Sequence, residues 1–308
     1  MRTEIFEFAG FNETTLPAEL WLPDGDVKAV LQITHGMTEH MGRYDAFAEY
    51  LLPLGIAVAG FDLRGHGKNP GDPNVASFGK NGWEASIRDM RLFFELLEHR
   101  FPKIPHYMLG FSLGSFLLRE YLGEYQEGVS GAVIMGTGYQ PGWLLSIMMG
   151  IVKGQIRKAG FDYTTDLVKQ LSFGTYNQKF QPNRTDADWL CADESELDKY
   201  LSDPLVRGSI SAGLFWELIG SMKRTGSRFE YDGWETDMPV LLISGQDDPV
   251  GDSGKGVRTV YQCMVKAGME NVTLHLLPNA RHDLLHEKKS GAAEKACRLI
   301  ADWMRAQG

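Results

Sequence analysis

Residues 107–114 read Y-M-L-G-F-S-L-G, and the centre of this stretch, residues 110–114, has the pattern G-x-S-x-G. The run before the serine, residues 107–109, is apolar and typical of a buried parallel strand. After the serine, residues 113–122 place apolar side chains at roughly helical spacing. A strand that becomes a helix within one or two residues strains the backbone at the turn, and flanking glycines relieve Cβ clashes there. We therefore predict that the hydroxyl of Ser112 stands above one edge of a sheet.

The composition indicates a soluble globular protein, because 43% of the 308 residues are hydrophobic and 23% are charged. This length accommodates one large α/β domain or two ordinary ones. The net charge of −9, without a dense Lys/Arg cluster, disfavours a nucleic-acid partner. The longest apolar-rich run, residues 143–152, has about half the length of a helix that spans a bilayer.

The cysteines and the first residues bear on location. Cys191, Cys263 and Cys297 are odd in number and widely spaced, so they predict neither a disulfide framework nor a zinc site. The first residues lack the charged and then apolar pattern of a secretory signal. We expect a cytoplasmic protein with reduced thiols, no metal and no cofactor.

Short apolar runs alternate with helical patterns along most of the chain. The expected strands cover residues 5–8, 19–22, 27–34, 56–61, 107–109, 129–135, 240–244 and 272–277. The expected helices cover residues 43–52, 83–100, 253–268 and 290–305, besides the one that follows Ser112. The first two strands are separated by a polar turn, which predicts an antiparallel hairpin at one edge. The pattern predicts a mostly parallel eight-stranded sheet with helices on both faces.

Residues 138–234 interrupt this alternation. They contain apolar helical patches at 143–152 and 215–222, joined by polar loops. Because they follow the sixth predicted strand, we expect a helical cap above the carboxyl ends of the sheet, where open α/β sheets bind ligands. The core domain then comprises residues 1–137 and 235–308. The alternative is a second domain unrelated to the site.

A serine hydroxyl becomes a good nucleophile only beside a base that is oriented by a carboxylate. On such a sheet the partners follow the serine in the order acid, then histidine, from loops at the carboxyl ends of strands. His282 is the base by position. In the preceding loop Asp247 and Asp248 compete for the acid, and we favour Asp248, which Pro249 follows. For Asp247 we expect an Asx-type hydrogen bond within the loop.

Two backbone N–H groups are needed for the oxyanion of a tetrahedral intermediate. The residue after the nucleophile supplies one, which is Leu113, and the loop after the third strand supplies the other, for which Met37 is placed. A zinc site has little support, because His35 and His40 do not form H-E-x-x-H and His286 has no third ligand beside His282.

Several motifs together carry a family resemblance. They are H-G-M-T-E-H-M-G-R-Y (35–44), D-L-R-G-H-G (62–67), G-F-S-L-G-S (110–115), G-Q-D-D-P-V (245–250) and R-H-D-L-L-H-E (281–287). The chain resembles the α/β-hydrolase serine hydrolases of the monoacylglycerol lipase and bacterial lysophospholipase type, sometimes grouped with serine aminopeptidases. Residues 183–205 look like the bacterial branch. The resemblance implies the α/β-hydrolase fold.

The resemblance also implies a substrate site. Glu39 and Arg43 correspond to the polar corner that receives the glycerol head in the lipase relatives. A second histidine lines that corner, and His286 comes one residue later than its counterpart there. The apolar run around Trp143 and Ile147 would suit an acyl tail and could touch a membrane surface transiently. Ordinary packing of the cap onto the core is the alternative for that run.

We therefore predict a serine hydrolase that cleaves carboxylic acyl esters, with a monoglyceride or lysophospholipid as substrate, through an acyl-enzyme on Ser112. A general short-chain carboxylesterase, an aminopeptidase or amidase, and an inactive binding module are the alternatives, and the oligomeric state stays open. An aminopeptidase needs carboxylates in the cap to hold a free α-amine. The candidates are Asp186, Asp188, Asp193, Glu194, Glu196 and Asp198, although such a run is more often a solvated face.

Overall fold

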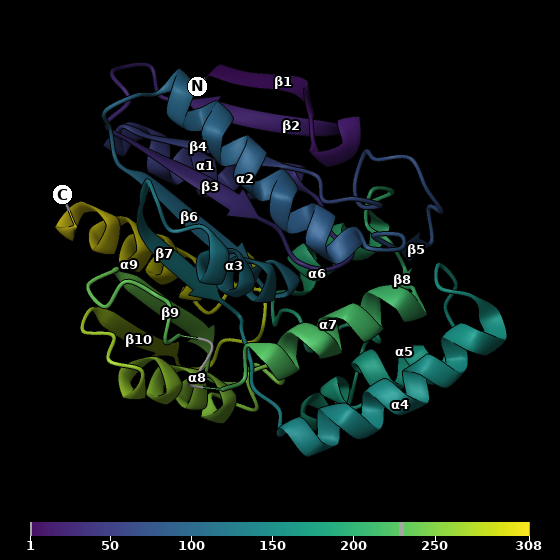
Figure 1. Cartoon of the computed structure of the whole chain (residues 1–308). Coiled ribbons are helices and arrows are strands. Elements are labelled where there is room, and N and C mark those ends of the chain that lie inside the picture. Colours follow the sequence, from purple (N-terminus) through teal and green to yellow (C-terminus); the bar gives the residue numbers. More distant parts are fainter. Residues whose placement is uncertain (1, 228–230, 308) are drawn as a thin grey trace.

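The computed structural model describes residues 2–227 and 231–307, and in this part of the chain eight strands form one sheet (Figure 1). The strands are β1 (Arg2–Ala9), β2 (Thr15–Leu22), β3 (Ala29–Thr34), β4 (Ile56–Phe61), β6 (His106–Phe111), β7 (Val129–Met135), β9 (Val240–Gly245) and β10 (Val272–Leu277). Their spatial order is β1-β2-β4-β3-β6-β7-β9-β10. The pairs β1–β2 and β2–β4 are antiparallel and the other pairs of this sheet are parallel. The predicted sheet, with its hairpin at one edge, is confirmed.

Burial explains which strands the sequence predicts best. Every residue of β3, β4, β6 and β9 is buried, because helices cover both faces of a parallel sheet. The edge strand β1 instead consists mostly of exposed and half-buried residues. It begins at Arg2, earlier than predicted, because its first residues are polar and carry no apolar signal.

Helices pack on both faces, as predicted. One hydrophobic cluster includes residues of α2 (Gly82–Arg100), α3 (Leu113–Glu124) and α8 (Lys255–Lys266), and the other includes residues of α1 (Asp45–Leu51) and α9 (Ala292–Ala306). Figure 1 shows α2 and α3 in front of the sheet and α9 behind it. Successive side chains of a strand point to opposite faces of the sheet. In β3, Val30 therefore belongs to the first cluster and Leu31 to the second. Short 3₁₀ helices occupy connecting loops: η1 (Phe11–Glu13), η2 (Met41–Tyr44), η3 (Leu52–Leu54) and η6 (Leu284–His286).

Residues 138–234, called the insert below, lie between β7 and β9. They form α4 (Gly142–Ala159), α5 (Asp166–Phe173), η4 (Tyr176–Phe180), α6 (Glu194–Ser202) and α7 (Ala212–Arg224). Figure 1 shows α4, α5 and α7 on the side of the molecule toward which β3 points. A two-residue strand of the insert, β8 (Ser209–Ile210), pairs in parallel with β5 (Val75–Ala76). The sequence does not predict this pair, because two residues are too few to show an alternation.

A few residues of the two predicted domains lie outside the described part of the chain. They are residues 228–230 of the predicted cap and residues 1 and 308 of the predicted core. Among the helices of the described part, none combines the length and the apolar character needed to cross a membrane.

Candidate active site

The backbone at Ser112 is strained, as the motif predicts. Ser112 lies between β6 and α3 with φ 52° and ψ −115°, a conformation that costs energy for any residue with a side chain. A Cβ on Gly114 would lie 2.0 Å from the carbonyl oxygen of Thr34, and one on Gly110 would lie 2.3 Å from that of Gly114. The two glycines therefore allow α3 to begin directly against β6 and β3. The turn leaves Ser112 half-buried at the carboxyl end of β6.

A chain of hydrogen bonds joins three residues that are far apart in the sequence. The oxygen Oγ of Ser112 lies 2.8 Å from Nε2 of His282, and Nδ1 of His282 lies 2.9 Å from Oδ2 of Asp248. An ionised carboxylate only accepts, so Nδ1 carries the proton and Nε2 is free to accept from the hydroxyl. Asp248 is fully buried, and its carboxylate also accepts from Ser244 Oγ at 3.1 Å and from the amide of Val250 at 2.8 Å. These bonds fix the carboxylate that orients the imidazole.

The neighbouring Asp247 binds a residue of the insert. Its carboxylate accepts from Nζ of Lys179 in the insert at 2.7 Å, and its side chain is 37% exposed. The two aspartates thus have different partners, and the structure joins Asp248 to His282. For Asp247, an ion pair to the insert takes the place of the expected Asx-type bond.

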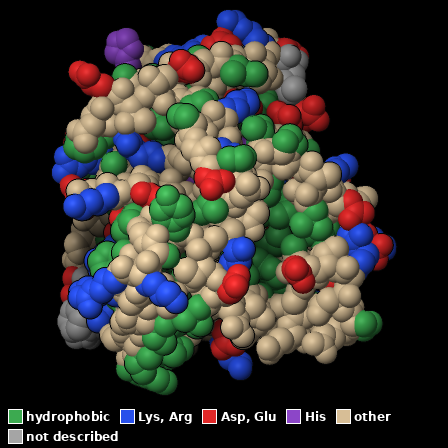
Figure 2. Space-filling view, turned by 90° about the vertical axis from the view of Figure 1, so that its right-hand side faces the viewer, with side chains coloured by type: hydrophobic (Ala, Val, Ile, Leu, Met, Phe, Trp, Pro, Cys, Tyr) green, Lys and Arg blue, Asp and Glu red, His purple; other side chains and the backbone are tan. Residues whose placement is uncertain are grey.

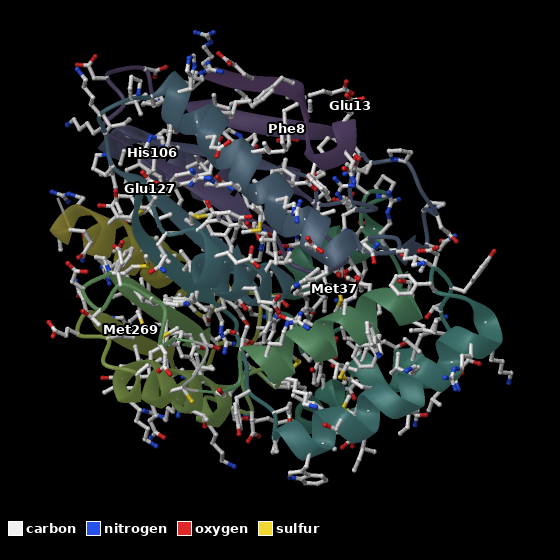
Figure 3. All side chains as sticks on the ribbon, viewed as in Figure 1. Phe8, Glu13, Met37, His106, Glu127 and Met269 are labelled. Atoms are coloured by element: carbon white, nitrogen blue, oxygen red, sulfur yellow. The ribbon has the colours of Figure 1, made fainter. Side chains whose placement is uncertain are left out.

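One expected oxyanion donor follows Ser112 directly in the chain, and the other lines the same cavity as Ser112. Leu113 is the first residue of α3, and the first N–H groups of a helix have no intrahelical partner. Met37 lies in the loop after β3, residues 35–40, called the β3 loop below, and it lines the same cavity as Ser112 and His282. Figure 3 labels Met37 on the side of the sheet that faces the insert.

Aromatic rings enclose the imidazole. The ring of Phe111 lies 4.9 Å from that of His282, and the ring of Trp189 in the insert lies 5.2 Å from it. Trp189 is 7% exposed and contacts Phe173, at 5.7 Å, and Tyr176, at 4.9 Å. Sequence reasoning missed Trp189, which directly follows the polar stretch 183–188 and has no pattern around it that indicates a contact with His282. The two rings therefore cover part of the imidazole of His282.

A cavity of about 700 Å³ opens at this point between the core and the insert. Its floor is formed by Ser112, His282 and the β3 loop. The insert contributes apolar side chains, Phe173, Trp189, Leu190, Leu201 and Val206, and polar ones, Asp166, Lys169, Gln170, Asn177, Asp186, Tyr200, Arg207 and Ser209. The volume is that of a typical small-molecule site.

Residues 25–289 match the sequence profile of the family described as serine aminopeptidase, S33. The chain belongs to this family. It is 26% identical over 285 residues to the monoglyceride lipase of Mus musculus, covering 92% of this chain and 84% of that protein. It is 25% identical over 289 residues to the monoacylglycerol lipase of Mycolicibacterium smegmatis, covering 91% of this chain and 90% of that protein. The resemblance carried by the motifs is confirmed.

Solved structures of other proteins share the fold. A carboxyl esterase from Bacillus coagulans in complex with glycerol has a TM-score of 0.87 at 21% identity, and the match covers 99% of each chain. The monoacylglycerol lipase of Paleococcus ferrophilus has a TM-score of 0.70 at 21% identity, covering 95% of this chain and 99% of that one. At these identities the likeness shows the fold alone, and the predicted α/β-hydrolase fold is confirmed.

The residues expected at a glycerol-binding corner are engaged with one another in this S33-family chain. Glu39 lines the cavity, but Arg43 and His286 are not among its lining residues. Arg43 Nη2 donates to Asp283 at 2.6 Å, and Nδ1 of His286 lies 2.8 Å from the same carboxylate. Sequence reasoning missed Asp283, whose pairing with Arg43 spans 240 positions. The structure thus brings Glu39, Arg43 and His286 together, with the latter two behind the cavity wall.

The residues expected at the acyl tail lie on α4, away from the cavity. Trp143 is 68% exposed and Ile147 is 54% exposed, and neither lines the cavity. Leu145 and Val152 are the buried residues of α4. At 100° per residue, Trp143 and Ile147 fall on the opposite face of this helix from Leu145 and Val152. Only one face of α4 packs on the rest of the protein, and the other is open.

Two other histidines of the first motifs, His35 and His66, are fully buried. Burial lowers the pKa of His35 and that of His66 to about 3, so both rings are neutral at physiological pH. Nε2 of His35 accepts from the amide of Leu63 at 2.9 Å. In the described part of the chain, no group of three or more His, Cys, Asp or Glu side chains is arranged to hold a metal ion.

Proposed function

We propose that this S33-family protein is a serine hydrolase that cleaves acyl esters of single-chain lipids, monoglycerides or lysophospholipids, through an acyl-enzyme on Ser112. The observation that carries the proposal is the hydrogen-bonded series Ser112, His282 and Asp248 at the floor of a cavity of about 700 Å³. The names of the mouse and mycobacterial relatives support a monoglyceride as substrate. No cofactor is required for this chemistry.

The proposed reaction follows from the atoms at the site. Ser112 Oγ attacks the acyl carbonyl carbon while Nε2 of His282 takes its proton, and Asp248 stabilises the imidazolium. The carbonyl oxygen becomes an oxyanion, which accepts from the N–H groups of Met37 and Leu113. His282 then gives the proton to the departing alcohol. Water, deprotonated by His282, attacks the ester of Ser112, which releases the fatty acid and restores the hydroxyl.

We propose that the insert is a cap domain, with residues 1–137 and 235–308 as the core. Insert side chains form one wall of the cavity, and Trp189 contacts the ring of His282. A cap with both roles would admit the lipid and exclude bulk water during acyl transfer. The proposal includes a cytoplasmic location, which the three free cysteines favour.

The carboxylates of the insert favour an ester over an aminoacyl substrate. A site for a free α-amine needs an available carboxylate near the serine. Of the six candidates, Asp188, Asp193, Glu196 and Asp198 already bind neighbouring donors. Among all six, which the structure describes, Asp186 alone lines the cavity. The bonds of those four candidates support an esterase, although Asp186 and Asp166 of the insert line the cavity and the family is described by its aminopeptidases.

A substrate series tests this choice. Because each buried CH₂ contributes about 0.8 kcal/mol, we expect kcat/KM for p-nitrophenyl esters to rise up to about fourfold per added CH₂ until the cavity is filled. A monoglyceride or lysophosphatidylcholine should be hydrolysed, and aminoacyl p-nitroanilides should react far more slowly. Faster turnover of the anilides would identify an aminopeptidase, and activity on short chains only would identify a general carboxylesterase.

The open face of α4 supports transient contact with a membrane surface. Trp143, Ile147 and Ile151 are at least 40% exposed and lie four residues apart on this helix. Figure 2 shows hydrophobic side chains gathered along the lower edge of this face of the molecule, with Lys and Arg beside them. The second half of α4 is basic and carries Lys153, Arg157 and Lys158. Apolar and basic side chains on one helix bind anionic lipid surfaces.

Replacing Trp143 and Ile147 together with serine should therefore weaken binding to anionic lipid vesicles. Loss of two large apolar contacts predicts a drop in the partition coefficient of roughly 10-fold or more, measured by vesicle flotation. The matched control is Ile5→Ser, which removes an equally exposed side chain (67%) on β1 at the far end of the sheet. Equal binding by both variants and the native protein would contradict contact through α4.

A further inference from the structure

Arg43 lies in a cluster of buried charges beneath the β3 loop. The side chains of Arg43, Glu39 and Asp283 are 8%, 4% and 8% exposed. Nη2 of Arg43 donates to Asp283 Oδ2 at 2.6 Å, and Nε of Arg43 lies 3.1 Å from Glu39 Oε2. One guanidinium thus joins a carboxylate of the β3 loop to a carboxylate of the loop after β10.

The first of these carboxylates holds the backbone next to the proposed oxyanion donor. Glu39 Oε1 accepts from the N–H of Gly36 at 2.6 Å, and Gly36 directly precedes Met37. The same oxygen accepts from the hydroxyl of Tyr44 at 2.8 Å. A shift of the Glu39 carboxylate would therefore move the amide that is to face the oxyanion.

The second carboxylate holds the loop of the proposed base. Asp283 directly follows His282, and its N–H donates to the carbonyl oxygen of Leu190 in the insert at 2.7 Å. Asp283 Oδ1 also lies 2.8 Å from Nδ1 of His286, whose Nε2 lies 3.2 Å from the carbonyl oxygen of Arg43. Arg43 is thus bonded to this loop through its side chain and its backbone.

We propose that Arg43 is a positioning residue that fixes the distance between the oxyanion donor Met37 and the base His282, and that it balances the charge of Asp283 beside that base. The inference rests on the proposed function, because it assigns Met37 and His282 their roles. It assigns Arg43 to the geometry of the reaction instead of to recognition of a glycerol head.

The charges around Arg43 indicate what its removal would do. The guanidinium faces Glu39, Asp283, His286 and the ring of Tyr200, whose centroid is 4.6 Å away. Burial alone would raise the pKa of Asp283, but His286 and Arg43 lower it well below its usual value. Without Arg43, two buried carboxylates would lose the cation they share.

The loss of Arg43 would also change the charge around the proposed base, His282. His282 is hydrogen-bonded to the carboxylate of Asp248 and interacts electrostatically with that of Asp283, its chain neighbour. It also contacts Ser112 and the uncharged rings of Phe111 and Trp189. An uncompensated charge on Asp283 stabilises the protonated imidazole. The base would then become protonated, and inactive, at a higher pH than in the native enzyme.

The test compares Arg43→Gln and Arg43→Lys with the native protein on two reactions that involve no glycerol head, hydrolysis of p-nitrophenyl acetate and phosphonylation of Ser112 by a fluorophosphonate. For Arg43→Gln we expect both rates to fall roughly 10- to 100-fold, the cost of a misplacement of about 1 Å. The acidic limb of the pH–rate profile should move up by roughly 0.5 to 1 pH unit. Arg43→Lys keeps the positive charge but lacks the planar guanidinium that can bind a carboxylate on each side. Its rates should therefore fall, while the acidic limb of its pH–rate profile should stay in place.

A second variant keeps the inference testable if Arg43→Gln does not fold. Asp283→Asn removes the opposite charge, so its acidic limb should move to lower pH. The matched control is Arg88→Gln, which breaks an exposed pair with Glu84 on α2 and should leave both rates unchanged.

The outcomes separate this inference from the proposed function. If Arg43→Gln raises KM for a monoglyceride but leaves phosphonylation and the pH profile as in the native protein, Arg43 recognises a head group and the inference is wrong. If the native protein is not phosphonylated at Ser112 at all, the proposed function fails first.

Discussion

Replacing Ser112 with alanine is expected to lower kcat on any acyl ester substrate by roughly 10⁴-fold or more. Without Oγ there is no atom to form the acyl-enzyme, so the two-step reaction through Ser112 cannot take place. The residual rate should come from binding and from the oxyanion donors. Initial rates with a p-nitrophenyl ester at saturating concentration measure the change.

A covalent probe tests the same prediction at one atom, Oγ of Ser112. A fluorophosphonate should add to the peptide that contains Ser112 in the native protein, and Ser112→Ala should take up no probe. Ser146→Ala is the matched control, because it deletes an exposed serine hydroxyl of α4, which donates to the carbonyl oxygen of Gly142. Retention of most activity by Ser112→Ala would remove the basis of the proposed mechanism.

The fold and the first three site residues were predictable because their signals are local. Each central strand is an apolar run with a loop after it, and parallel strands place all those loops at one edge of the sheet. Ser112, Asp248 and His282 each follow such a run, so the order of motifs in the sequence was enough to predict that they meet. The edge strand β1 and the two-residue pair of β5 with β8 gave weaker signals.

The surroundings of the site could not be predicted, because they depend on contacts between distant segments. Arg43 and Asp283 are 240 positions apart, and no sequence pattern around either residue predicts that they form an ion pair. Trp189 reaches His282 only through the fold of the insert. The apolar run of α4 was ambiguous for a related reason, since a helix with one buried face and one open face has the same composition as a helix that lines a lipid site.

Replacing Asp248 with asparagine should cost on the order of 10³- to 10⁴-fold in kcat. The contacts of the carboxylate explain why. Oδ1 accepts from the fixed backbone N–H of Val250, so the amide oxygen of an asparagine would take that position and the NH₂ group would face His282. The NH₂ group can only donate, so Nδ1 would have to accept and the proton would move to Nε2. The imidazole could then no longer accept the proton of Ser112.

Asp247→Asn is the matched control, because it makes the same chemical change one residue earlier. The carboxylate of Asp247 forms an exposed ion pair with Lys179, with side-chain exposures of 37% and 45%, and such pairs contribute about 0 to 1 kcal/mol. Its kcat should therefore stay within a few-fold of the native value. Rates of both variants on one p-nitrophenyl ester, together with the fluorophosphonate labelling rate of Ser112, decide the matter. If Asp247→Asn is the more damaging change, the orienting acid is Asp247, and the bond between Asp248 and His282 has only a structural role.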